Sequence, residues 1–258
     1  MWPTGGLLHW PRSRLGGETP NHENPPPPSS RAAVCLRWLP LPARGDRPRR
    51  PVVSPFGSSY RDVEELLAER GVEVDHVSVF RWVQRFTPLL AEAARPCRHR
   101  VGDRWRVDET DVKVAGQWRY VYRAIDQFGQ VIDVFVAAQR DAKAARRCFE
   151  RAIGTTTVTP VEVVTDRAAT YPIVLEELVP AAWHRTERYA NNRVEADHGR
   201  LKARLRPMRG LKQDRSAKIM IAGHGFVQNL RRGHYELATE EPVNRRLAVA
   251  FNELALAI

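Results

Sequence analysis

RWRVDET, residues 104–110, predicts a short buried strand that ends in a carboxylate, because apolar and polar residues alternate up to Asp108. A second apolar run, residues 161–166, ends on Asp166 in the same way. A later segment predicts a helix with Glu195 in its first turn. Carboxylates gathered at one edge of a sheet repel one another unless a divalent cation lies between them. We therefore expect Asp108, Asp166 and Glu195 to form a metal site.

Three carboxylates suit the chemistry of phosphodiester bonds, which needs an activated oxygen nucleophile and a stabilised leaving 3′-oxygen. Two Mg²⁺ ions about 3.5–4 Å apart supply both, and hard cations require oxygen ligands. We assign Asp108 to bridge both ions, Asp166 to bind one and Glu195 to bind the other, with Mn²⁺ able to replace Mg²⁺. Water would be the nucleophile for nicking and a DNA 3′-hydroxyl the nucleophile for joining. Other acids nearby rank below these three: Glu109, Asp111, Asp126 and Asp197.

The charge of the chain points to a polyanionic partner. The formal net charge is +11, and basic residues cluster, which favours nucleic acid over a merely basic soluble protein. Three cysteines without CxxC spacing support neither a zinc site nor a disulfide framework. No apolar run approaches the roughly 20 residues of a membrane span, and the start lacks a signal peptide. We expect a cytoplasmic, nucleoid-associated protein with no membrane partner.

Residues 1–57 are rich in proline and arginine and are predicted to be disordered or aberrant. The run of four prolines at 25–28 is typical of this composition. A basic arm on DNA phosphates is the functional interpretation. Disorder without a role, or a mis-assigned start, is the alternative that we favour.

A helix-turn-helix domain is predicted at residues 58–95. Apolar residues at helical spacing mark helices at 60–70 and 77–86, with a short connection between them. The second helix of such a pair enters the major groove of DNA. Four of its polar residues face outward and are candidate DNA contacts: Ser78, Arg81, Gln84 and Arg85. An ordinary helical hairpin explains the same spacing.

Residues 101–236 predict an α/β domain whose segments follow the order β-β-β-α-β-α-β-α, with later strands expected at 117–126, 131–137 and 183–189 and a helix that Asp141 begins. This is the order of the ribonuclease H-like fold, a mixed five-stranded sheet with flanking helices, here preceded by the small helical domain. Its first and fourth strands are neighbours, so Asp108 and Asp166 are expected to lie close together. Residues 237–258 form a C-terminal helix that we assign to packing or to a dimer surface.

A basic run follows Glu195. His198 and Lys202 share the helical face of Glu195 and are candidates to orient a phosphate, although a packed structural histidine is an equal alternative for His198. Further candidate DNA contacts in this run are Arg204, Arg206, Arg209 and Lys212. A solvated helix face is the usual explanation of such a run, but release of counterions from DNA would favour this one, which only Asp214 interrupts.

Six segments together resemble one known family. They are Trp105 to Thr110, Tyr120 to Asp126, Asp141 to Ala145, Val164 to Ala168, Tyr189 to Lys202 and Arg206 to Lys212. In this combination they resemble the DDE transposases of the insertion-sequence family typified by IS26, over about residues 59–236. The resemblance implies a catalytic triad of Asp108, Asp166 and Glu195, a replicative outcome and a working homodimer. Asp111 stands where that family generally has tyrosine.

We therefore expect a metal-dependent transposase, a DDE-type polynucleotidyl transferase. It would nick and join DNA at the inverted-repeat ends of an insertion sequence, with these ends and the target DNA as partners. The alternative is a catalytically inactive, truncated or decayed transposase that only binds DNA. A structure-selective nuclease, which would cut DNA lacking the ends, is a third possibility.

Overall fold

A mixed five-stranded sheet lies at the centre of the computed structural model, which describes residues 58–187, 190–208 and 210–258. The strand order is β3-β2-β1-β4-β5, in which the first and fourth strands are neighbours, as predicted for a ribonuclease H-like domain. The strands are β1 (Arg104–Val114), β2 (Gln117–Asp126), β3 (Val131–Ala137), β4 (Glu162–Val164) and β5 (Trp183–Arg185). The first three pair antiparallel, whereas β1, β4 and β5 pair parallel. The prediction for residues 1–57 lies outside the described residues.

Strand β1 is longer than predicted, so Asp108 does not end it. The strand continues to Val114 because β2 pairs with it along almost its whole length. Ala115 and Gly116 close this hairpin with φ angles of 49° and 80°, the left-handed pair that a tight two-residue turn requires. Local alternation could not show this length, because it is set by pairing with another strand.

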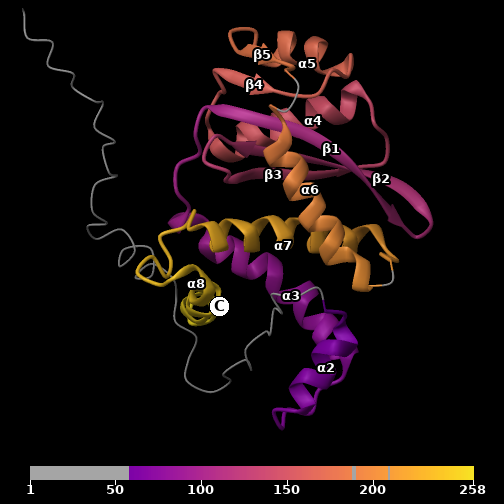
Figure 1. Ribbon diagram of the computed structural model, residues 1–258, viewed down its shortest axis with the longest axis vertical. Coiled ribbons are helices and arrows are strands. Elements are labelled where there is room, and N and C mark those ends of the chain that lie inside the picture. Colours follow the sequence, from indigo (N-terminus) through magenta and orange to yellow (C-terminus); the bar gives the residue numbers. More distant parts are fainter. Residues whose placement is uncertain (1–57, 188–189, 209) are drawn as a thin grey trace, which may run out of the picture.

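Alternation along β1 gives the sheet two different faces. Trp105 and Val107 pack against α4 (Ala142–Thr156) and α5 (Thr170–Leu178). Val112 and Val114 point to the other face, where they pack with residues of α6 (Asn192–Leu205) and α7 (Asp214–Arg232). Figure 1 shows α6 crossing the sheet in front of β1. Because side chains alternate in a strand, Asp108 belongs to the α6 face and Glu109 to the α4 face.

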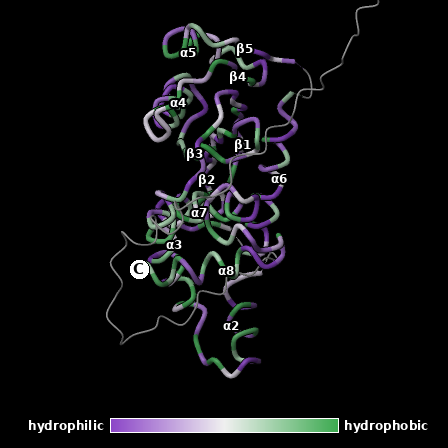
Figure 2. Tube along the Cα trace, turned by 90° about the vertical axis from the view of Figure 1, so that its left-hand side faces the viewer, coloured by the Kyte–Doolittle hydropathy of each residue, from purple (hydrophilic) through white to green (hydrophobic). Residues whose placement is uncertain are grey.

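Helix α4 begins as predicted, because the Asp141 Oδ1 accepts a hydrogen bond from the Ala144 N–H at 2.7 Å. The helix buries Ala145, Phe149 and Ala152 against the sheet. Strand β5 is shorter than its predicted span, residues 183–189, and two of those residues lie outside the described ranges. The traces of the helices alternate hydrophobic and hydrophilic segments, as amphipathic helices do (Figure 2).

The N-terminal helices are α2 (Tyr60–Ala68) and α3 (His76–Ala94). Ser59 begins α2 with a capping box to Asp62. The sequence predicted a helix at 77–86, and α3 continues beyond it through Pro88 to Ala94, with 19 residues in all. Its C-terminal half is held by tertiary packing, because Leu90 and Ala94 are buried together with residues of α7 and α8 (Val243–Ala255). This packing offsets the hydrogen bond that a proline removes.

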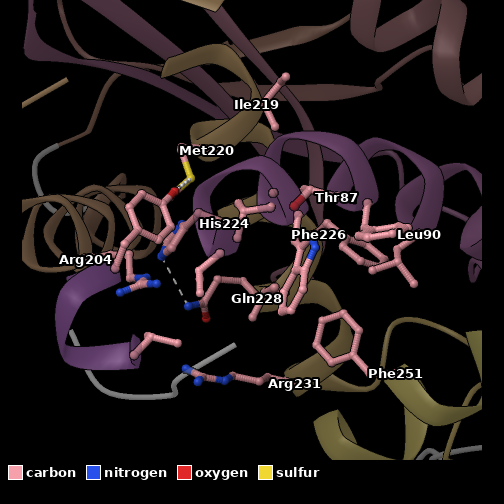
Figure 3. A pocket seen from close by; sticks show the side chains of 18 of the residues that line it. Thr87, Leu90, Arg204, Ile219, Met220, His224, Phe226, Gln228, Arg231 and Phe251 are labelled. Atoms are coloured by element: carbon pink, nitrogen blue, oxygen red, sulfur yellow. Dashed lines mark hydrogen bonds between the residues drawn. The ribbon is translucent and has the colours of Figure 1, made fainter. Parts of the chain in front are cut away.

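A cavity of about 410 Å³ lies among α2, α3, α6 and α7. Its wall combines apolar and basic side chains, and Figure 3 shows several of them: Leu90, Arg204, Ile219, Met220, His224, Phe226, Gln228, Arg231 and Phe251. The Tyr60 hydroxyl donates to the Met220 Sδ at 2.9 Å across it. The Arg204 guanidinium donates to the Ser58 carbonyl at 2.8 Å. These two hydrogen bonds link the start of α2 to the core.

Candidate active site

Asp108 lies just beyond the point where β4 stops pairing with β1. Strand β4 pairs with β1 only through Arg106, so the residues of β1 that follow have β2 alone as a strand neighbour. The Asp108 side chain is 15% exposed, and its Oδ2 lies 3.5 Å from the His198 Nε2 on α6. The carboxylate is therefore enclosed between the sheet and α6.

Asp166 follows β4 after one intervening residue. Because β4 is parallel to β1, its carboxyl end points to the same edge of the sheet as Asp108. The Asp166 Oδ1 accepts the Ala168 N–H at 3.0 Å, and its Oδ2 accepts from Arg140 at 3.2 Å. Its side chain is 38% exposed. Asp166 is thus an accessible carboxylate whose orientation is held by two donors.

Glu195 lies in the first turn of α6, as predicted, and is exposed. The start of this helix is fastened to β1, because the Asn191 side-chain amide donates to the Val107 carbonyl at 3.2 Å. Val194 is buried with Ile125 and Val131 on the same side of the sheet. These contacts bring the first turn of α6 next to the residue that precedes Asp108.

Asp108 lies in the electrostatic field of neighbouring acids. Burial, first, and then the charges of Glu109, Asp166 and Glu195 raise the pKa of Asp108 to about 7. A carboxyl in this setting gains from a cation placed among the acids, and oxygen donors are the ligands that Mg²⁺ prefers. The donor chemistry of the three side chains fits such an ion. Within the described ranges, however, no group of three acids, histidines or cysteines is already placed at ligating distances.

The four acids that we ranked lower all have structural partners. Glu109, on the opposite face, accepts from the Tyr171 hydroxyl and pairs with Arg140. The Asp126 carboxylate accepts the N–H groups of Gly102, Phe128 and Gln130 and so holds a turn. Asp111 faces Lys202, with 3.4 Å between the Asp111 Oδ1 and the Lys202 Nζ.

Asp197 is the centre of a buried ionic cluster. Its carboxylate, 1% exposed, pairs with three arginines: Arg123 on β2, Arg200 on α6 and Arg232 on α7. Burial pushes the pKa of Asp197 up, but the hydrogen bonds and charges of the arginines hold it below its ordinary value. Arg123 is fully buried, and burial lowers its pKa to about 10. This cluster joins α6, which carries Glu195, to the sheet and to α7.

Sequence reasoning missed Arg140, Tyr171 and Arg123. Arg123 had a detectable signal, because it is a cation within the predicted strand 117–126 between apolar neighbours. Arg140 and Tyr171 had none, since their partners lie on strands far away in the sequence.

The comparisons with known proteins decide the family. A family model described as a DDE domain matches residues 102–234. The chain belongs to the DDE transposase family. A transposase for the insertion sequence-like element IS431mec of Staphylococcus aureus is 38% identical over 151 residues, covering 57% of this chain and 67% of that relative. A transposase for insertion sequence element IS257 in transposon Tn4003, also from Staphylococcus aureus, is 36% identical over 154 residues, covering 58% and 68%.

Two solved structures are also similar to this transposase. The HTLV-2 integrase catalytic core domain in complex with magnesium is 17% identical, with a TM-score of 0.42 and coverage of 59% of this chain and 99% of that chain. The catalytic core domain of BIV integrase is 19% identical, with a TM-score of 0.38 and coverage of 50% and 83%.

The predicted DNA contacts of the transposase fall into distinct settings. Arg81, Arg85, Arg206 and Lys212 are exposed, whereas Ser78, Gln84 and Lys202 are partly buried. Arg204 lines the cavity beneath α2, and His198 is only 5% exposed. Burial and the charge of Arg123 lower the pKa of His198 to about 4, so its ring is neutral at physiological pH. Arg209 lies outside the described residues.

None of the described helices combines the length and the apolar character that a membrane span requires.

Proposed function

We propose that this transposase nicks and joins DNA at the inverted-repeat ends of an insertion sequence, using Asp108, Asp166 and Glu195 to hold two Mg²⁺ ions. The convergence of three elements supports this assignment: the exposed edge of β1, the end of parallel β4 and the first turn of α6. Bound cations would supply activation of the attacking oxygen and stabilisation of the leaving 3′-oxygen. Mn²⁺ would substitute for Mg²⁺.

The protein groups around the acids have separate tasks in this proposal. His198, neutral at physiological pH, encloses Asp108 without adding a charge. Lys202 shares the Glu195 face of α6 and, held beside Asp111, orients the DNA phosphate. The Asp197 cluster keeps α6 in place, so that Glu195 remains beside β1.

We also infer a separate role for each segment of the chain. Residues 58–95 bind the DNA ends as a helix-turn-helix, residues 101–236 carry the chemistry and residues 237–258 complete the core. Two copies working as a homodimer would join two ends to one target. A DNA substrate implies a cytoplasmic, nucleoid-associated location.

Asp166→Asn tests the proposal, because it removes one charge while keeping the shape of the side chain. We expect the variant to bind a DNA fragment that carries the element end as tightly as the parent, and to lose Mg²⁺-dependent nicking and strand transfer by at least a hundredfold. Gel-based cleavage and binding assays on the full chain measure both. Unchanged nicking would reject the assignment, and a parent that binds but never cuts would identify a DNA-binding protein only.

A further inference from the structure

Arg140 connects two carboxylates that lie on different strands. It belongs to the loop between β3 and α4, and its side chain is 51% exposed. The guanidinium contacts the Glu109 Oε1 and also lies 3.2 Å from the Asp166 Oδ2. One side chain thereby ties the middle of β1 to the loop after β4.

Glu109 is a firm anchor for this arginine. Its side chain is 3% exposed and points to the face of the sheet opposite Asp108. Its second oxygen accepts from the Tyr171 hydroxyl of α5, which is itself buried. A buried carboxylate that is paired and hydrogen-bonded on both oxygens is held in a single orientation.

Asp166 depends on this anchor for its own orientation. It lies in a loop and is partly exposed, so without partners its carboxylate would rotate. Its Oδ1 is held locally by the Ala168 N–H, and among the described residues Arg140 is the side chain that connects its Oδ2 to the neighbouring strand. Groups that orient ligating side chains are costly to remove even though they touch no substrate.

We propose that Arg140 is a positioning residue for strand transfer: anchored by Glu109 and Tyr171 on the far face of the sheet, it fixes the Asp166 carboxylate beside Asp108. This inference rests on the proposed function, because it assigns Asp166 as a ligand. Another arginine provides a matched control. Arg146 on α4 pairs with Glu177 on α5, and both side chains are at least a third exposed, so Arg146→Gln removes the same charge from the same region without touching Asp166.

The experiment compares the full chain with Arg140→Gln, Arg140→Lys, Arg146→Gln and Asp166→Asn. Equilibrium binding of Mn²⁺ alone, followed by the loss of the free-ion EPR signal, reports the site independently of activity. Strand transfer of an end fragment with a free 3′-hydroxyl reports the reaction, and thermal unfolding reports folding. We expect Arg140→Gln to weaken Mn²⁺ binding and to slow strand transfer, each by about 10–100-fold. Arg146→Gln should match the parent in both.

Arg140→Lys keeps the charge but cannot span both carboxylates, so it should fold and still lose at least tenfold in strand transfer. Full activity in Arg140→Lys would overturn the inference even if Arg140→Gln proved unstable. Tighter Mn²⁺ binding with faster transfer in Arg140→Gln would also overturn it, because Arg140 would then only oppose the cation.

If Arg140→Gln matches the parent while Asp166→Asn is inactive and fails to bind Mn²⁺, the inference alone fails. If Asp166→Asn binds Mn²⁺ and transfers strands normally, the proposed function fails with it.

Discussion

The Asp108 carboxylate is mostly buried and lies within the field of three other acids, and its pKa is raised to about 7. A raised carboxyl pKa means that the ionised form is less favourable in the folded chain than in the unfolded chain. The folded chain is therefore progressively destabilised by this group as pH rises from about 4 to 7. Above pH 7 the full cost of holding an ionised carboxylate in this buried position is present. The Asp108 carboxylate, which we propose as a cation ligand, thus opposes folding when no cation is bound.

Asp108→Asn should remove this penalty. At pH 8 in EDTA we expect the variant to exceed the parent in free energy of unfolding by about 2–4 kcal/mol, while it loses strand transfer completely. Thermal unfolding with and without Mg²⁺ measures the effect. The cation should raise the midpoint of the parent and leave that of the variant unchanged. Equal midpoints for the two proteins in EDTA would contradict the electrostatic account of this residue.

At the scale of elements, the position of α6 depends on the Asp197 cluster. Asp197→Ala leaves the fully buried Arg123 without its carboxylate partner, and breaking a buried ion pair in this way costs about 3–5 kcal/mol. Chemical denaturation of the variant measures this loss. Asp214→Ala is the control, because Asp214 pairs with Arg119 at the surface and should cost at most about 1 kcal/mol. Similar losses of unfolding free energy in both variants would show that the buried cluster stabilises the fold no more than a surface ion pair does.

Helix α7 adds an acid-sensitive group. His224 lies against Arg123, and burial followed by the charge of Arg123 lowers the pKa of His224 to about 3. A lowered histidine pKa contributes stability that is present above pH 6.5 and is lost as pH falls towards 3. By pH 5 this loss reaches about 2 kcal/mol. We expect His224→Gln to reduce the loss of unfolding free energy between pH 6.5 and 5, as measured by chemical denaturation. The same loss in the variant and the parent would exclude His224 as its cause.

Sequence patterns predicted the elements well wherever local periodicity determined them. β2 and β3 have their predicted bounds, and Asp141 begins α4 as expected. The predicted bounds were too short where tertiary contacts set the limits: β1 extends past Asp108 because of its pairing with β2, and α3 extends past residue 86 because both of its ends pack. For the site, each acid was visible at the end of an apolar segment or in a first helical turn. Their partners were not, because hydrogen bonds between distant loops leave no periodic signal.

At the scale of the whole molecule, the chain has a net charge of +11, and its basic side chains differ in how far they are exposed to solvent. Arg81 on α3 is exposed, whereas Arg204 on α6 donates to the backbone of residue 58 beneath α2. Partial burial lowers the pKa of Arg204, as expected for a guanidinium that loses part of its contact with solvent. The two arginines therefore have different roles. Arg81 is available to a DNA phosphate, whereas Arg204 joins the N-terminal helices to the core.

DNA binding measured over a range of salt concentrations should separate these uses. Each cation that neutralises a phosphate adds about one to the slope of log affinity against log salt. We expect Arg81→Ala to lower this slope by about one and to leave thermal stability unchanged, since the side chain is exposed. Arg204→Ala should leave the slope unchanged and lower the unfolding midpoint, because it removes one of the hydrogen bonds across the cavity. If Arg81→Ala leaves the slope as it was, residues 60–94 form an ordinary helical hairpin instead of a DNA-reading domain, and the basic run after Glu195 must supply the end contacts.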